Sequence, residues 1–229
     1  DLSAPGEVKL WVDQDRLLPH TDPFNRQITV GLGCFLELLR LAGAADGYRV
    51  DLDLFPDGFD ETALDARPVA VATFTKDPTV APDPLFDHVL ERRSHKEAFD
   101  TGRGVSDQTL AKIQRSALHG TKIGASNNLD HLESVRTLTR EAMLIEINTE
   151  RTYKESVDLL RIGKTEIEAN PDGIDLSGPK FETLHLLGMI SREGALDTGS
   201  AEFEQGKAAV LEPIATAMAH LWLVSDTPD

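Results

Sequence analysis

Cysteine is almost absent from this sequence, which has 229 residues and a single thiol at Cys34. One thiol forms no internal disulfide, and it cannot supply a zinc site built from several thiolates. Because Cys34 lies within an apolar helical pattern, we expect it to be buried and inert. The zinc motif His-Glu-x-x-His and a phosphate-binding loop ending in Lys-Ser/Thr are also missing. The sequence therefore predicts no metal site and no catalytic side-chain set.

Positive charge is scarce, since Lys and Arg number 23 against 39 Asp and Glu, for a net charge of −16. Such a surface repels nucleic acids and anionic bilayers, so we expect neither as a partner. Long apolar runs are missing too, because the best candidate, 28–45, is interrupted by Gly31, Gly33, Glu37 and Arg40. We therefore expect no membrane span. The two glycines are interpreted as points of close helix packing.

The spacing of apolar residues predicts a strand-rich first part of the chain. Alternating patterns indicate strands, and spacings of three and four indicate a helix with one buried face. The stretch 75–84, which follows, contains three prolines and is typical of a region that holds a linker. The predicted strands are 8–13, 48–55 and 69–74, the helix is 25–45, and the linker is 78–83.

After the linker the pattern becomes mainly helical. Ser106 is a favourable N-cap for one helix, and the long periodic stretch 129–160 predicts two helices with their joint near 149–152. This order of strands and helices favours an α+β fold over a doubly wound sheet. The other predicted elements are a short helix at 84–91, a strand at 122–125, a helical extension at 161–169, a turn at 170–173, helices at 181–189 and 201–219, and a strand at 220–224.

A cationic segment stands out within this acidic chain. If residues 92–96 are extended, Arg92, Ser94 and Lys96 lie on one side, where they form a suitable grip for a phosphate. Alternatively, the cations end a helix and complement its dipole. The residues alone support the two interpretations equally.

The cationic segment and the residues after it resemble the start of a nitroreductase-family domain. The resemblance is carried by Arg92-x-Ser94-x-Lys96, by Ala98-Phe99-Asp100, and by Val105-Ser106-Asp107 at a helix start. The wider chain is similar to the two-part, Acg-like subgroup of this family, some members of which carry twin-arginine signals. Further similar stretches are 22–27, 35–40, 83–86 and 217–229.

This resemblance implies an α+β, nitroreductase-like fold with a central sheet flanked by helices and two related halves in one chain. The first half is 1–77, the linker is 78–83, and the second half is 84–229. We expect the first to be incomplete at its start and the second at its end, as in a central portion of a longer protein. The two halves of the subgroup imitate the usual homodimer, so the chain is expected to be a dimer or a pseudo-dimeric monomer.

The resemblance also implies FMN as the cofactor. Arg92, Ser94 and Lys96 would hold its phosphate and ring edge, with Arg93 in support. The turn after the long helices, represented here by Gly173 and Ile174, would approach the flavin ring. Glycine permits such a backbone approach, although an ordinary helix-ending turn explains the same residues.

The implied activity is that of an FMN-dependent oxidoreductase, which passes hydride or electrons from NAD(P)H to a quinone, nitro compound or similar small-molecule acceptor. An alternative is a protein that binds and sequesters FMN without turnover. A third is a cofactor-free domain whose cations dock an acidic partner. The compartment stays open: an upstream twin-arginine signal would make the protein periplasmic, and otherwise it is cytoplasmic.

Overall fold

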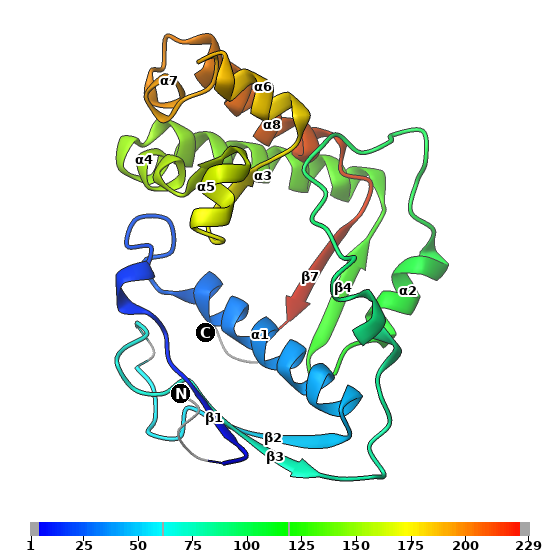
Figure 1. Cartoon of the computed structure of the whole chain (residues 1–229). Coiled ribbons are helices and arrows are strands. Elements are labelled where there is room, and N and C mark those ends of the chain that lie inside the picture. The colour runs from blue at the N-terminus through cyan, green and yellow to red at the C-terminus, as the bar shows by residue number, and fades with distance from the viewer. Residues whose placement is uncertain (1–4, 61, 119, 225–229) are drawn as a thin grey trace. The chain divides into compact units, whose positions relative to one another are not determined.

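The computed structural model describes residues 5–60, 62–118 and 120–224. The last five residues of the stretch 217–229, used above for the family resemblance, therefore lie outside the described residues. Helices and strands are mixed along the chain, which confirms the α+β class (Figure 1). The chain divides into two compact units between Ser94 and His95.

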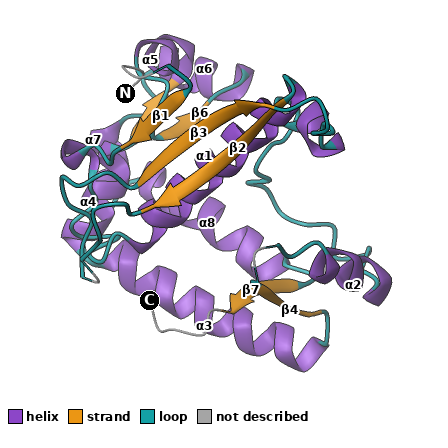
Figure 2. Cartoon of the chain, turned by 90° about the horizontal axis from the view of Figure 1, so that it is seen from below, coloured by secondary structure: helices purple, strands orange, loops and turns teal. Residues whose placement is uncertain are grey.

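The first unit is a three-stranded antiparallel sheet with one long helix on it (Figure 2). The strands are β1 (Glu7–Leu10), β2 (Tyr48–Leu54) and β3 (Ala70–Lys76), with β3 in the centre. Helix α1 (Arg26–Ala45) contacts β2. A short 3-10 helix, η1 (Gln14–Arg16), follows β1. The structure confirms the three predicted strands and the helix.

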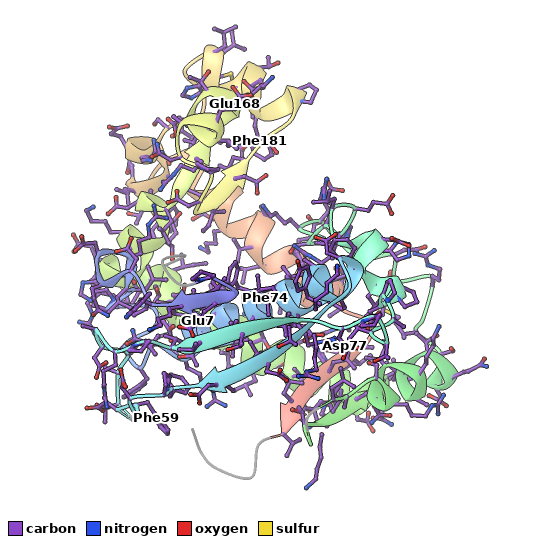
Figure 3. All side chains as sticks on the ribbon, turned by 60° about the horizontal axis from the view of Figure 1, so that its bottom comes forward. Glu7, Phe59, Phe74, Asp77, Glu168 and Phe181 are labelled. Atoms are coloured by element: carbon purple, nitrogen blue, oxygen red, sulfur yellow. The ribbon has the colours of Figure 1, made fainter. Side chains whose placement is uncertain are left out.

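Small side chains allow α1 to lie close to the sheet. Leu41 and Ala44 on the helix are buried, as are Val50 and Ala72 on the strands. Gly43 makes the closest approach, because a Cβ atom there would lie 2.5 Å from Val50 Cγ2. Phe74 of β3, labelled in Figure 3, lies next to this contact.

The rest of α1 does not match the predicted burial. Cys34 is exposed, and a Cβ atom on Gly31 or Gly33 would meet nothing within 4 Å. The expectations of a buried thiol and of close packing at these glycines were wrong, because α1 rests on the sheet mainly through its C-terminal half. By length and composition alone α1 could cross a membrane, but the core helix of a globular protein meets the same criteria. It carries the Glu37–Arg40 ion pair and contacts β2, so it is no clear membrane span.

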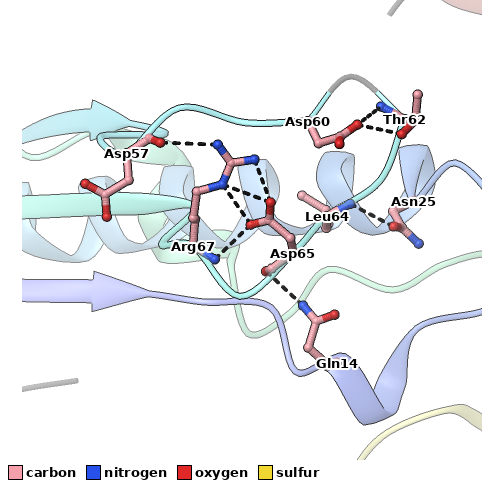
Figure 4. Close-up of polar contacts among 8 residues, drawn as sticks. All are labelled: Gln14, Asn25, Asp57, Asp60, Thr62, Leu64, Asp65 and Arg67. Atoms are coloured by element: carbon pink, nitrogen blue, oxygen red, sulfur yellow. Dashed lines mark hydrogen bonds and ion pairs between the residues drawn. The ribbon is translucent and has the colours of Figure 1, made fainter.

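A polar network holds the loop between β2 and β3 (Figure 4). Asn25, which has a positive φ of 54°, accepts a hydrogen bond of 2.9 Å from the Leu64 N–H through its side chain. Arg67 pairs with the Asp65 carboxylate, and Gln14 donates to the Asp65 carbonyl at 2.8 Å. These bonds attach the loop both to the start of α1 and to η1.

The boundary between the units falls after the predicted linker at 78–83. A 3-10 helix, η2 (Pro84–His88), follows that stretch and contacts α1, so it belongs to the first unit. Asp83 caps η2 by accepting a 2.9 Å hydrogen bond from the Leu85 N–H. The boundary consequently divides the cationic segment, with Arg92, Arg93 and Ser94 in the first unit and Lys96 in the second.

The second unit is mainly helical. Its long helices α3 and α4 meet at Thr149, which confirms the predicted joint, and α3 runs alongside α8 (Figure 1). Ser106 caps α2 by accepting a 3.2 Å hydrogen bond from the Thr109 N–H, as predicted. The elements are α2 (Asp107–Arg115), β4 (Lys122–Ser126), α3 (Leu129–Asn148), α4 (Glu150–Asp158), β5 (Leu160–Ile162), α5 (Gly163–Ala169), β6 (Ile174–Leu176), α6 (Pro179–Leu186), α7 (Arg192–Leu196), α8 (Ala201–Thr216) and β7 (His220–Val224).

Three short elements of the second unit, β5, β6 and α7, were not predicted from the sequence. The stretch 161–169 does not extend the preceding helix, because β5 intervenes and Gly163, with a φ of 79°, begins the separate helix α5. The turn at 170–173 leads into β6, which pairs in parallel with β5. Helix α7 was also missed. Three-residue strands show too little alternation to be recognised before their pairing is known.

The described strands form three small sheets. The three-stranded sheet belongs to the first unit, and the second unit holds the antiparallel pair β4–β7 and the parallel pair β5–β6. The two pairs remain separate because each strand hydrogen-bonds only to its partner among the described residues. Mixed α+β architecture is thus established at the level of class.

Candidate functional site

The cationic segment follows a short turn after η2. Arg92 N–H donates to the His88 carbonyl at 3.0 Å, and residues 92–96 are neither helix nor strand. The segment thus begins where the turn after η2 ends. Arg92 Nη1 donates to Ser94 Oγ at 3.3 Å, so the two side chains meet on one side, as the alternation predicted.

Arg93 has a different arrangement from its neighbours. Its guanidinium donates to the carbonyls of Leu90 and Arg92 at 2.7 and 2.8 Å. These bonds hold the turn from which Arg92 and Ser94 project. Arg93 thus supports the segment through the main chain.

Lys96 makes a long-range contact. Its ammonium donates to Asp175 Oδ1 at 2.6 Å and to the Asp175 carbonyl at 3.2 Å, 79 positions along the chain. The hydrogen bond from Lys96, followed by one from the Ser177 hydroxyl, lowers the pKa of the Asp175 carboxyl. The carboxylate is therefore ionised at neutral pH, and Lys96 is bound to strand β6.

The predicted turn residues lie immediately before this contact. Gly173 has a φ of 74°, and a Cβ atom there would collide with the Leu159 carbonyl, which accepts a 2.9 Å hydrogen bond from the Ile174 N–H. The close backbone approach at Gly173 is thus to Leu159. It sets the start of the β5–β6 pair and places Ile174 beside Asp175, the partner of Lys96.

Lys96 and Ile174 line a cavity of about 520 Å³ within the second unit. This volume lies in the range of about 300–1,000 Å³ that is typical of small-molecule sites. Most of the lining is aliphatic, with Phe181 of α6 as one aromatic wall (Figure 3). The walls come from β5, β6 and the helices α3, α4, α6, α7 and α8.

The charged side chains of the lining have partners within the protein. Lys96 pairs with Asp175, and Lys207 lies 3.4 Å from a Glu204 carboxylate oxygen. Glu202 accepts a 3.5 Å hydrogen bond from the Ser191 hydroxyl. The space that remains is bounded by apolar groups and by a few uncharged polar side chains.

An ion pair behind the cavity joins three of its supporting elements. Arg192 at the start of α7 donates to Glu166 Oε2 at 2.6 Å and also to the Leu160 carbonyl. The Ile162 N–H donates to the same carboxylate oxygen at 2.9 Å. The bond from Arg192, followed by that from Ile162, lowers the pKa of Glu166 to about 2. The two partners, Glu166 and Arg192, lie 26 residues apart in the sequence.

The described residues contain no group of three or more His, Cys, Asp or Glu side chains that could hold a metal ion. The predicted residues Lys96 and Ile174 meet at one cavity, whereas Arg92, Arg93 and Ser94 form a separate hydrogen-bonded segment of the first unit. The other lining residues gave no signal beyond ordinary helical periodicity. The sequence matches no protein-family model and no curated protein.

Proposed function

We propose that this protein is an FMN-dependent oxidoreductase of the nitroreductase type, which passes hydride or electrons from NAD(P)H to a quinone, nitro compound or similar acceptor. One observation carries the proposal. Lys96, the last residue of the predicted phosphate strip, is bonded to Asp175, directly after the predicted Gly173–Ile174 turn. Lys96 and Ile174 thus lie at one cavity, although they are far apart in the sequence.

The residues of this site fit the chemical parts of FMN. A cavity of about 520 Å³ with mainly apolar walls suits a planar ring system. Arg92, Ser94 and Lys96 offer two permanent cations and a hydroxyl, which suit a phosphate. The ion pair of Lys96 with Asp175 does not oppose this role strongly. Its side chains are 54% and 53% exposed, and such surface pairs contribute only about 0–1 kcal/mol.

The roles proposed for the chain's own residues are those that the resemblance implies. Arg92 and Lys96 would bind the phosphate, and the Ser94 hydroxyl would donate a hydrogen bond to a phosphate oxygen. Arg93 would hold the turn that orients them. Gly173 and Ile174 would border the ring, and the apolar walls would exclude water from it. When bound, FMN supplies the hydride chemistry, so the protein needs no acid–base pair of its own for that step.

The proposed fold is the finer part of the same hypothesis. The two units would be related halves of a nitroreductase-like domain, in a chain that is a dimer or a pseudo-dimeric monomer. The support for this proposal is the order of motifs along the sequence together with the α+β class. A measurement of molar mass in solution by light scattering separates the dimer from the monomer.

A visible absorption spectrum tests the cofactor. The purified chain is incubated with FMN, separated from the excess by gel filtration, and examined for retained flavin bands. We expect bands for the unaltered protein and their loss in Arg92→Ala and Lys96→Ala. Lys164→Ala is the matched control, because Lys164 is an exposed cation whose ion pair is with Glu168 of its own helix. A colourless unaltered protein, or bands that survive both substitutions, would contradict the proposal.

Turnover is tested separately from binding. Flavin-loaded protein should consume NADPH or NADH when a quinone or a nitroaromatic compound is supplied. Flavin bands without nicotinamide consumption would instead establish the alternative, an FMN-sequestering protein.

A further inference from the structure

The cavity of the second unit contains uncharged polar groups without partners. Tyr153 and Ser156 lie on α4 at positions i and i+3, which share one helix face, and Gln205 lies on α8. All three line the cavity. Within the described part of the chain, no hydrogen bond joins any of these side chains to another protein group. An apolar cavity with a few polar groups is the usual form of a small-molecule site.

The Tyr153 hydroxyl is held in a defined place. Its ring packs edge-to-face against buried Phe203, with centroids 5.4 Å apart and an interplanar angle of 80°. A Cβ atom on Gly206 of α8 would lie 3.9 Å from the hydroxyl oxygen, so the hydroxyl lies close to this glycine. Burial raises the pKa of Tyr153, so the phenol keeps its proton at neutral pH. The cavity wall therefore presents a fixed O–H donor.

Charge on the lining favours an uncharged occupant. Lys96 and Lys207 are each neutralised by a carboxylate, so neither requires an anion. Glu202 is directed toward the start of α7, where its carboxylate accepts from Ser191 and lies so close to Gly194 that a Cβ atom there would collide with it. What remains for a ligand is apolar contact and hydroxyl donors.

We infer that this cavity binds a neutral, largely apolar molecule that carries a carbonyl oxygen, and that Tyr153 donates a hydrogen bond to that oxygen. Ser156 and Gln205 provide further polar contact near it. The inference depends only on the second unit and requires no flavin. It concerns the same cavity that the FMN proposal assigns to the flavin ring, so the two ligands would exclude one another, and the probes are therefore tested on the FMN-free chain.

The test compares two probes of nearly equal shape by titration calorimetry on the full, FMN-free chain. 2-Acetylnaphthalene carries the carbonyl oxygen, whereas 2-ethylnaphthalene does not. One neutral hydrogen bond corresponds to about a 2- to 12-fold difference in affinity. We expect the unaltered protein to bind both probes and to prefer the acetyl compound by a factor in this range.

Tyr153→Phe should bind both probes with equal affinity, because it keeps the ring and its packing on Phe203 while removing the donor. The other tyrosine provides the control: Tyr48 packs against Phe74 in the first unit, so Tyr48→Phe should leave the preference unchanged. A preference that survives Tyr153→Phe would overturn the role of this hydroxyl. Absence of binding by either probe would overturn the site.

A second variant places a bulky side chain in the cavity. Ala209 lines the cavity from an exposed position of α8, so Ala209→Phe should fold and should weaken both probes by more than tenfold. If Ala209→Phe bound both probes as tightly as the unaltered protein, the proposed location of the ligand in this cavity would be wrong. Flavin retention, measured on the same preparations by absorption, reports on the FMN proposal alone. The two hypotheses can therefore be distinguished when either fails.

Discussion

The two units bury their apolar side chains in different ways. In the first, Gly43 of α1 approaches Val50 of β2, Ala44 and Ala72 are buried, and the pocket in the β2–β3 loop has a volume of only about 10 Å³. In the second, helices and short strands surround about 520 Å³. Small residues permit close approach of backbones, whereas long side chains on several helices leave space at their junction. The larger cavity therefore lies in the second unit.

Truncation of a core side chain in the second unit should cause the largest loss of stability. Leu132 on α3 is only 1% exposed, so Leu132→Ala should lower the free energy of unfolding by about 2–5 kcal/mol. Leu138→Ala on the same helix is the control. Leu138 is 67% exposed, and its loss should change stability by no more than about 0.5 kcal/mol. Urea unfolding of both variants measures the difference, and equal effects would contradict the assigned core.

A single added methyl group should disturb the close packing of the first unit. Gly43→Ala places its Cβ against Val50 Cγ2, and such overpacking should cost about 1–3 kcal/mol. Gly33→Ala on the same helix points into open space and should stabilise by about 0.5–1 kcal/mol. Amide hydrogen exchange shows whether the loss is confined to β1–β3. If Gly43→Ala were as stable as Gly33→Ala, α1 would not lie so close to the sheet.

The ion pair between Glu166 and Arg192 should contribute less to the free energy of unfolding than the core contacts do. Glu166→Gln removes the charge that binds Arg192 and should cost about 1–2 kcal/mol at neutral pH. Because folding lowers the pKa of Glu166 from 4.5 to about 2, its contribution is full above pH 4.5 and is lost as the pH falls toward 2. Glu168→Gln serves as control, since its ion pair with Lys164 is exposed. Parallel stability curves for the unaltered protein and Glu166→Gln between pH 2 and pH 5 would contradict this account.

A smaller pH effect is expected where β7 lies near α3. Burial, followed by the nearby His131 and Arg136, lowers the pKa of His220 from 6.5, and its Nδ1 and His131 Nε2 are buried without partners. The folded state therefore favours the neutral imidazole, and stability should decline as the pH falls below 6.5. Hydrogen exchange of the β4–β7 pair at pH 5 and pH 7 measures this decline. His220→Gln should reduce the difference, and an unchanged difference would assign it to another group.

Much of the first unit could be predicted from its sequence. Strong alternation identified β2 and β3, because the alternating pattern extends over several residue pairs. Regular spacing of apolar residues identified α1, because that pattern extends over several helical turns. The joint at Thr149 and the Ser106 cap were also predicted from local chemistry. The prediction that Cys34 is buried was wrong. Periodicity indicates which face of a helix is buried, but it does not show how far along the helix the sheet extends.

The second unit was less predictable for a physical reason. Strands β5 and β6 exist because they pair with each other, and Glu166 is held by Arg192 across 26 positions. Local patterns contain no trace of such distant partners. Lys96 was singled out by its charge, but its bond to Asp175 and the cavity beside it required the three-dimensional structure.

The most direct test of the proposed function is an NMR map of FMN binding. FMN is titrated into the full chain labelled with ¹⁵N, and the amide shifts of both units are followed. We predict that saturating changes concentrate at residues 92–96 and 173–176, with little change in β1–β3. Absence of saturating shifts, or shifts confined to the sheet and the 55–69 loop of the first unit, would contradict the assignment of the flavin site.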